Sequence, residues 1–179
     1  MTVTVDTATS RVLPTTEINL VTAATSLTPT LRSRSSETDA LARLPDSTIA
    51  DLEKAQLFNM LVPKMYGGLQ CWLRTFMDVV VELGRGEGSA AWTLALLSIG
   101  TWMAATLYPK HVVDEIFSDG NFRTANVLSP RKVKTRRVDG GVLIEEGSWS
   151  FNSGVHHARS CASSQLNDFP RKTSAPVLL

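Results

Sequence analysis

The spacing of apolar residues changes near residue 120, from a helical period to an alternating one. Before that point apolar side chains recur every three or four positions, which is typical of amphipathic helices. The pattern predicts helices over 17–42, from Ile49 to Pro63, over 71–84 and over 89–107, and a short helix after Pro109. Pro29 has no backbone N–H, so we expect the first helix to kink or split there.

The helix predicted over 89–107 differs from the others because almost all of its residues are apolar or small. A helix that is apolar on every side is surrounded by protein, so we expect it to be the buried centre of its domain. Gly84 and Gly86 are expected to end the helix before it.

Alternating polarity over 122–127 predicts a strand. Two more alternating runs, 132–138 and 142–146, are joined by an Asp-Gly-Gly turn at 139–141, which predicts a β-hairpin. Residues 148–153 are expected to begin a further strand.

These patterns predict an α+β chain, with an all-helical N-terminal domain over 16–120 and the beginning of an antiparallel β domain over 121–158. Residues 1–15 are rich in Thr, Val and Ser, and we expect a disordered leader. Residues 159–179 have no useful period and differ from everything before them. We interpret them as an atypical tail, translated out of frame, that leaves the β domain cut off.

The composition is that of a globular protein, with 43% hydrophobic and 20% charged residues. A net charge of +1 gives no reason to expect nucleic acid or an anionic membrane as a partner. No apolar run reaches the roughly 20 residues of a membrane-spanning helix, and no signal-peptide pattern is present. Cys71 and Cys161 form no CxxC motif, which argues against a disulfide framework or a metal site and predicts a cytoplasmic protein.

The most informative stretch is 147–158, GSWSFNSGVHHA, at the end of the predicted hairpin. Trp149 could stack on a flat aromatic ligand, and Ser150, Asn152 and Ser153 could reach polar atoms at the edge of that ligand. A flavin ring is such a ligand. Small polar residues around an aromatic side chain also occur in ordinary turns, so an exposed strand end with one buried Trp is the alternative.

Several motifs in residues 43–158 follow the order found in acyl-CoA dehydrogenase-like flavoproteins. They are 61–68 (LVPKMYGG), 82–92 (ELGRGEGSAAW), 101–102 (TW), 107–109 (LYP), 127–130 (VLSP), 138–141 (VDGG) and 147–158. Within that family the chain is most similar to the two-component flavin-dependent aromatic monooxygenases. The likeness ends at Ala158.

The resemblance implies a longer protein with a helical domain, a middle β domain and a C-terminal four-helix bundle that is absent here. It implies a homotetramer, reduced flavin (FMN or FAD) supplied by a separate flavin reductase, and hydroxylation of a small aromatic or heteroaromatic compound with O2. An acyl-CoA dehydrogenase, in which bound FAD accepts a hydride from an acyl-CoA, is the alternative within the family.

The resemblance also implies roles for single residues. Ser153 is the expected catalytic hydroxyl, a hydrogen-bond donor beside flavin N5. The expected cofactor-binding residues are Trp149, Ser150, Asn152, Ser153 and Ser129. Trp92 and Trp102 are expected to line the substrate pocket, although tryptophans on an apolar helix more often pack in a core.

His156 and His157 are candidate bases, but neighbours in a strand point to opposite faces, so at most one of them is expected to face the site. His111 is expected to face solvent. Some relatives carry a histidine near the positions of Gly100 and Thr101 that contacts a phenolic substrate, and this chain has none. An indole-type or other heteroaromatic substrate is therefore favoured.

Two readings of the whole chain stay open. In the first, the chain is a truncated flavin monooxygenase, inactive alone, with apolar surface left bare. In the second, it is a non-enzymatic helical interaction module whose bare faces are covered by a partner chain. Uptake of flavin would distinguish the two.

Overall fold

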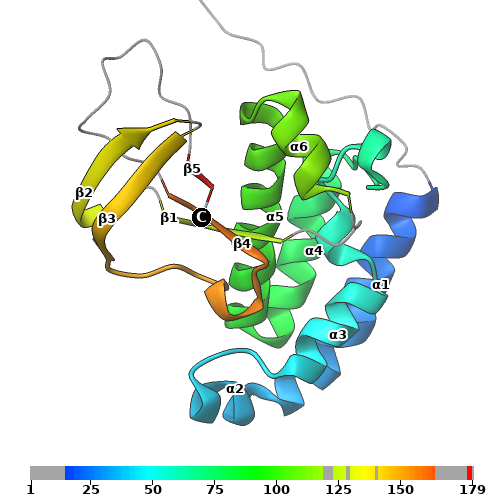
Figure 1. Ribbon diagram of the computed structural model, residues 1–179. Coiled ribbons are helices and arrows are strands. Elements are labelled where there is room, and N and C mark those ends of the chain that lie inside the picture. The colour runs from blue at the N-terminus through cyan, green and yellow to red at the C-terminus, as the bar shows by residue number, and fades with distance from the viewer. Residues whose placement is uncertain (1–14, 119–122, 128–129, 140, 164–176, 179) are drawn as a thin grey trace, which may run out of the picture.

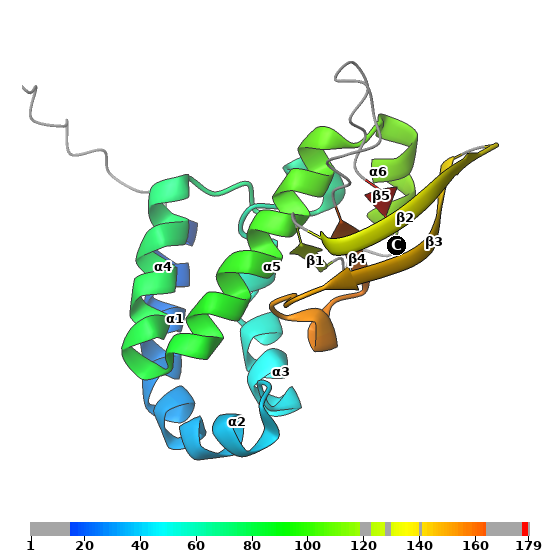
Figure 2. The same ribbon diagram turned by 90° about the vertical axis from the view of Figure 1, so that its left-hand side faces the viewer.

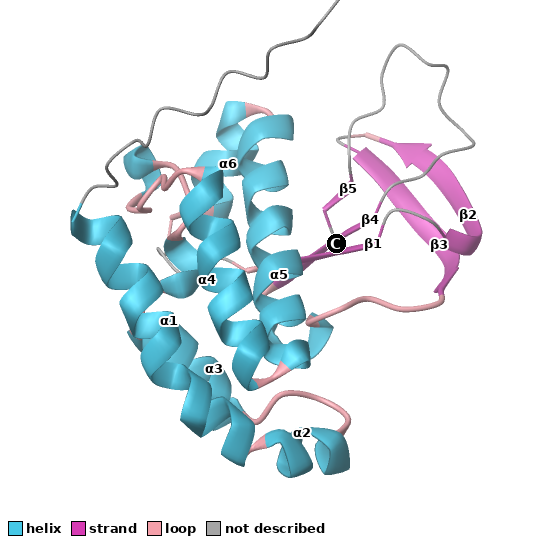
Figure 3. Ribbon diagram, turned by 180° about the vertical axis from the view of Figure 1, so that it is seen from behind, coloured by secondary structure: helices cyan, strands magenta, loops and turns pink. Residues whose placement is uncertain are grey.

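The computed structural model describes residues 15–118, 123–127, 130–139, 141–163 and 177–178. Helices form one side of the molecule and short strands the other (Figure 1, Figure 3). The helical elements are α1 (Thr15–Ser33), α2 (Ser35–Leu41), α3 (Asp46–Lys54), α4 (Leu73–Gly86), α5 (Gly88–Leu107) and α6 (Lys110–Ile116), with short 3₁₀ turns η1 (Leu57–Asn59) and η2 (Lys64–Tyr66). Apart from Thr15, which begins α1, the predicted leader lies outside the described residues.

The first predicted helix is split, but not at Pro29. α1 continues through this proline, and the break between α1 and α2 comes at Arg34. α1 lies along α4 (Figure 2) and buries Leu20, Ala24 and Leu31. This packing outweighs the single backbone hydrogen bond that a proline removes from a helix.

The second predicted helix is shorter than its apolar spacing suggests. It was expected to reach Pro63, yet α3 ends before Gln56, which takes a left-handed backbone conformation with a φ of 59°. Leu52, Leu57 and Met60 are all fully buried. Their spacing therefore reflects burial on both sides of a turn rather than one continuous helix.

α4 passes through Gly84, which was expected to stop it, and ends at Gly86. Gly86 lies against α1, where an added Cβ would be only 2.8 Å from the carbonyl oxygen of Thr28. The glycine therefore permits close packing of the two helices. Trp72, which lies within the predicted range 71–84, precedes α4 and is half exposed.

α5 is the central helix, but it is not buried on all sides. At its N-terminus the Glu87 carboxylate accepts hydrogen bonds from the backbone N–H groups of Ser89 and Ala90. One face packs in the core, whereas Trp92 is 60% exposed and Trp102 is 49% exposed. The expectation of a helix surrounded by protein was wrong for this face. The expectation that no apolar run is long enough to span a membrane was wrong, because α5, with 20 residues, passes that test by length and composition; core helices of soluble proteins also pass it.

The main core lies among α1, α3, α4 and α5. Its large, fully buried apolar side chains include Leu52, Leu57, Met60, Phe76, Leu83, Leu94 and Leu97. A smaller cluster joins α5 to α6 through Ala104, Val113 and Phe117. Both clusters hold α5 firmly, so side chains near its N-terminus are displayed from a rigid support.

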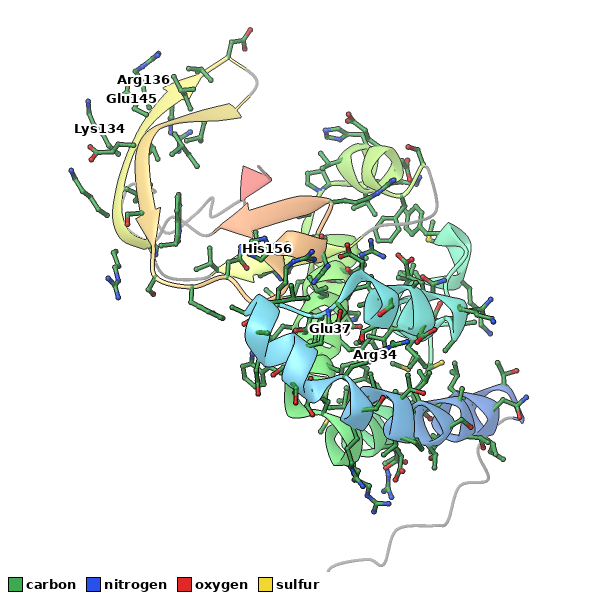
Figure 4. All side chains as sticks on the ribbon, turned by 90° about the horizontal axis from the view of Figure 1, so that it is seen from below. Arg34, Glu37, Lys134, Arg136, Glu145 and His156 are labelled. Carbon is green, nitrogen blue, oxygen red and sulfur yellow. The ribbon has the colours of Figure 1, made fainter. Side chains whose placement is uncertain are left out.

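The described strands form two small sheets. β2 (Pro130–Val138) and β3 (Gly141–Trp149) form the predicted antiparallel hairpin. In the hairpin Lys134 and Arg136 both pair with Glu145 on the neighbouring strand (Figure 4). In the other sheet β4 (Ser160–Ser163) lies between β1 (Thr124–Val127) and β5 (Val177–Leu178), parallel to β1 and antiparallel to β5.

Two expectations about the strands were wrong, and one strand pair runs parallel beside the predicted antiparallel ones. Residues 160–163 were assigned to an irregular tail, yet they pair with β1 because backbone pairing needs no apolar period. That pair is parallel, so the β region is not wholly antiparallel. No strand covers 148–153: β3 ends at Trp149, and the chain turns into a 3₁₀ turn, η3 (Val155–His157).

The helices and the strands meet where β1 crosses α5. Gly100 makes this possible, because an added Cβ there would lie 2.3 Å from the carbonyl oxygen of Thr124. Beside it, the Thr101 hydroxyl accepts a 3.3 Å hydrogen bond from the backbone N–H of Thr124. The division into domains over 16–120 and 121–158 stays a prediction.

Candidate functional site

A cavity of about 740 Å³ lies between the α2–α3 segment, the N-terminal turns of α5 and the loop that follows β3. Its walls come from three parts of the chain that are far apart in sequence. The lining residues are Thr38, Asp39, Ala42, Arg43, Leu44, Gly88, Ser89, Trp92, Thr93 and residues 151–157. The cavity is therefore built by tertiary packing and not by any one motif.

Gly154 fixes the loop against α5. Its φ is 76°, a left-handed conformation that side chains disfavour, and an added Cβ would lie 2.9 Å from Leu97 Cγ. The carbonyl oxygen of Gly154 accepts a 2.9 Å hydrogen bond from the backbone N–H of His157, which closes η3. Only glycine satisfies both the backbone conformation and the contact with the buried Leu97.

Arg123 ties the far end of the same loop to the helices. Its Nε donates a 2.8 Å hydrogen bond to the carbonyl oxygen of His157. Its guanidinium pairs with Glu53 of α3 and lies over the Phe58 ring, 5.2 Å from the ring centroid. The loop is thus held at Gly154 and at His157, with Ser153 at the end of this anchored stretch.

Ser153 and Trp92 are in direct contact inside the cavity. The indole Nε1–H of Trp92 donates a hydrogen bond to Ser153 Oγ, with a donor–acceptor distance of 3.1 Å. Both residues were predicted site residues, one from the helical part and one from the end of the hairpin. The fold brings them together across 61 positions of sequence.

Two polar atoms near the end of the hairpin are buried without a partner. Among the described residues, Asn152 Oδ1 and Trp149 Nε1 have no hydrogen-bond partner. The Trp149 ring packs over Gly147, where an added Cβ would lie 2.3 Å from the indole. Asn152 lines the cavity, so its oxygen could accept a hydrogen bond from a ligand there, whereas Trp149 does not line the cavity.

The cavity edge carries an ion pair and a histidine with a lowered pKa. Arg43 Nη1 lies 2.7 Å from Asp46 Oδ1, and this hydrogen bond lowers the pKa of the Asp46 carboxyl group. Burial lowers the pKa of His157, and the nearby positive charge of Arg43 lowers it further. The imidazole of His157 therefore favours its neutral form.

Both histidines of the motif line the cavity. The expectation that at most one could face the site was wrong, because His156 and His157 lie in the η3 turn and not in a strand. His111, predicted to face solvent, is exposed on α6. No group of three or more His, Cys, Asp or Glu residues in the described part of the chain could hold a metal ion.

The structure brings only some of the predicted site residues together. Ser153, Asn152 and Trp92 line the cavity, whereas Trp102 lies further along α5 and does not. Ser150 is exposed outside the cavity, and Trp149 is half-buried in the hairpin. Ser129 lies outside the described residues.

Sequence reasoning missed the wall formed by the α2–α3 segment. Thr38, Asp39 and Arg43 line the cavity, although nothing in the local pattern marks them as more than polar surface residues. Their role depends on the turn after α2, where Ala42 takes a left-handed conformation with a φ of 50°. Polar residues beside helix ends are common, so the sequence alone does not indicate that these residues form a wall of the cavity.

Comparison with known proteins finds homologues among flavin-dependent monooxygenases. The oxygenase subunit HsaA of a flavin-dependent monooxygenase from Mycobacterium tuberculosis is 33% identical over 133 residues, which are 74% of this chain and 33% of the relative. The oxygenase component of p-hydroxyphenylacetate 3-hydroxylase from Acinetobacter baumannii is 29% identical over 130 residues, 73% of this chain and 30% of the relative. A comparison with protein-family models found no match.

Solved structures of monooxygenases superpose on this chain as well. The crystal structure of HsaA from M. tuberculosis superposes with a TM-score of 0.77 at 30% identity, covering 83% of this chain and 40% of the other. The chain is therefore homologous to part of the oxygenase subunits of flavin-dependent monooxygenases, and it shares the acyl-CoA dehydrogenase-like fold of their solved structures. XiaF from Streptomyces sp., solved in complex with FADH2 and glycerol, superposes with a TM-score of 0.76 at 26% identity, covering 83% of this chain and 37% of that one. The chain spans about a third of the length of the curated relatives it matches.

Proposed function

We propose that this monooxygenase-family chain forms the helical and flavin-facing part of the oxygenase component of a two-component hydroxylase. The proposed reaction places one oxygen atom of O2 on a small aromatic or heteroaromatic compound. The observation that carries the proposal is the convergence of Trp92, Asn152 and Ser153 on one cavity. Homologues of the chain are oxygenase components of this kind.

The proposed roles follow the positions of the side chains. Ser153 is the hydroxyl donor at the flavin N5 edge, in a loop held rigidly against α5. Asn152 offers a buried oxygen to the ring, and Trp149, Ser150 and Ser129 are further proposed contacts. Bound reduced flavin would supply the electrons that activate O2. The protein's part is to hold the ring, donate hydrogen bonds to its edge and keep the neutral His157 nearby.

The helical wall of the cavity is proposed to hold the substrate. Trp92 lines the cavity, and an aromatic side chain there suits an aromatic ring. Trp102, which is half exposed on α5, is a further proposed contact with the substrate. The proposed partners are a separate flavin reductase and further copies of the oxygenase in a homotetramer, in the cytoplasm.

Flavin binding by the purified chain tests the proposal. Titration with FMN and FAD, followed by quenching of flavin fluorescence, should give saturable binding. Asn152→Ala and Ser153→Ala should each weaken binding about two- to tenfold, the range expected for one hydrogen bond. Ser118→Ala removes an exposed hydroxyl at the end of α6 and should leave binding unchanged. Failure of the wild-type chain to bind either flavin would contradict the proposed site.

Oxygen incorporation tests the reaction itself. The chain is supplied with reduced flavin, isotopically labelled O2 and a panel of phenols and indoles, and products are analysed by mass spectrometry. The truncated chain is expected to be inactive alone, and any hydroxylated product that does form should carry one oxygen atom from O2. Product oxygen that comes from water instead would rule out a monooxygenase reaction.

A further inference from the structure

The hydrogen bond between Trp92 and Ser153 is not explained by burial. Trp92 is 60% exposed, so apolar packing does not hold its indole in place. Nevertheless the indole N–H is directed at Ser153 Oγ at 3.1 Å, across the cavity that both residues line. A large aromatic side chain in this position serves an interaction with the loop rather than the core.

The chemistry of the two groups limits what Ser153 can do. An indole N–H is a donor only, whereas a serine hydroxyl has one proton to donate and two lone pairs that accept. Since Trp92 donates, Ser153 Oγ is the acceptor in this bond, and its own proton must point elsewhere. A hydroxyl that accepts a hydrogen bond is also polarised into a better donor.

Both ends of the bond are held by the fold. Trp92 stands in the second turn of α5, whose first turn is capped by Glu87. Ser153 precedes Gly154, which is pressed against Leu97 of the same helix. The geometry of the pair is therefore set by the packing of the loop on α5 and does not need a ligand to form it.

We propose that Trp92 is a positioning residue for Ser153. Its indole N–H occupies a lone pair of the serine oxygen and so directs the serine proton away from the indole, toward a hydrogen-bond acceptor of a flat ligand in the cavity. This inference rests on the proposed function, in which that ligand is the flavin. It assigns to Trp92 an effect on cofactor binding through Ser153, in addition to any contact with substrate.

The first test examines the hydrogen bond in the free chain. The four tryptophans each give one indole N–H signal in the NMR spectrum of the isotope-labelled protein. Ser153→Ala should shift the signal assigned to Trp92 and speed its exchange with solvent, while the Trp72 and Trp102 signals stay in place. An unchanged Trp92 signal would show that the bond is absent in solution and would overturn the inference.

The second test separates positioning from contact. Affinity for FMN is measured for wild type, Trp92→Phe, Ser153→Ala and the double variant, with melting temperatures to show that each is folded. Trp92→Phe keeps an aromatic ring but removes the N–H donor together with part of the indole, so the double variant is needed to isolate the effect of the donor. Trp92→Phe should weaken binding about two- to tenfold in the wild-type background, the range expected for one hydrogen bond, and have almost no effect when Ser153 is already Ala.

The outcomes distinguish the two proposals. An equal loss from Trp92→Phe in both backgrounds would show that Trp92 acts by its own contact and would overturn the positioning role. Wild-type affinity in Trp92→Phe with weakened binding in Ser153→Ala would also overturn it while leaving the flavin site standing. Wild-type affinity in Ser153→Ala would instead contradict the proposed function, and the inference with it. Trp72→Phe, a half-exposed tryptophan outside the cavity, is the matched control.

Discussion

At the scale of single residues, the site depends on a glycine whose conformation and surroundings both exclude a side chain. Gly154 has a positive φ and lies within van der Waals distance of Leu97 on α5. The two constraints act together, because relief of one by a backbone shift would worsen the other. Ser153 is consequently held in a fixed position relative to Trp92.

Gly154→Ala is therefore expected to lower the free energy of unfolding by about 2 kcal/mol, from left-handed strain and overpacking against Leu97. It should also weaken flavin binding. Gly88→Ala is the control, because an added Cβ at that position meets nothing within 4 Å. Urea denaturation of the three proteins measures the difference, and equal stability of Gly154→Ala and wild type would refute the argument.

His157 makes the stability of the folded chain depend on pH. Burial keeps its pKa in the folded state below the unfolded value of about 6.5, so the unfolded state binds the proton more readily. The stability that neutral His157 contributes is present above that pH and is lost as the pH falls below it. The carboxyl groups with lowered pKa values titrate in a more acidic range.

The melting temperature should therefore fall between about pH 7.5 and about pH 5.5, and fall less in His157→Gln, which has no titratable group. His111→Gln, on exposed α6, should behave as wild type. Differential scanning fluorimetry across this range is sufficient. A pH dependence in His157→Gln as steep as in the wild type would assign the effect to other groups.

At the scale of elements, the N-terminus of α5 supports the helical wall of the cavity. The Glu87 carboxylate accepts hydrogen bonds from Ser89 N–H at 2.9 Å and Ala90 N–H at 2.6 Å. Ser89 and Trp92 in the first turns both line the cavity. Fraying of this end would move them away from the loop that carries Ser153.

Glu87→Ala is expected to destabilise the chain by about 1 kcal/mol, the usual value of an N-terminal cap, and to weaken the contact between Trp92 and Ser153. Glu87→Asp keeps an acceptor at a position where Asp is favoured and should retain most of the stability. Thermal unfolding followed by circular dichroism compares the variants. The prediction fails if Glu87→Asp and Glu87→Ala lose stability equally.

At the scale of the whole molecule, one apolar face of α5 remains uncovered within the described residues. Trp92, Ile99, Trp102 and Leu107 are exposed, and their spacing places them on one side of the helix. Contiguous apolar patches of this kind mark surfaces that contact another molecule or lead to aggregation. Together with the net charge of +1, this patch leaves little charge repulsion between copies of the chain.

We expect the chain to self-associate as its concentration rises, and the double variant Trp102→Glu/Leu107→Glu to do so less. Burial of two carboxylates in an apolar contact is costly, whereas both positions tolerate charge in the exposed state. Sedimentation velocity measures the change. Thr22→Glu adds charge at an exposed position of α1 and should not alter association. Equal association of all three proteins would show that this face is not the contact.

Periodic patterns in the sequence predicted which helices and strands form better than they predicted where those elements end. The apolar spacing predicted α5 within one residue at its start, and the two alternating runs predicted the β2–β3 hairpin. Local pattern could not place the end of α3, because the positive φ of Gln56 is imposed by packing on both sides of it. Nor could it show that 160–163 pair with β1, since pairing is made by backbone groups that every residue carries.

The sequence by itself determined the family, the helical and hairpin elements, and the candidate residues Trp92, Asn152 and Ser153, because these depend on local pattern and on motifs. Only the tertiary structure decided which candidates meet. It joined Trp92 to Ser153, left Trp102 apart, placed both histidines of the motif in the cavity lining and added the wall from the α2–α3 segment. The physical reason is that a cavity is made by the packing of distant segments, and the orientation of each side chain in it is set by contacts that no local pattern records.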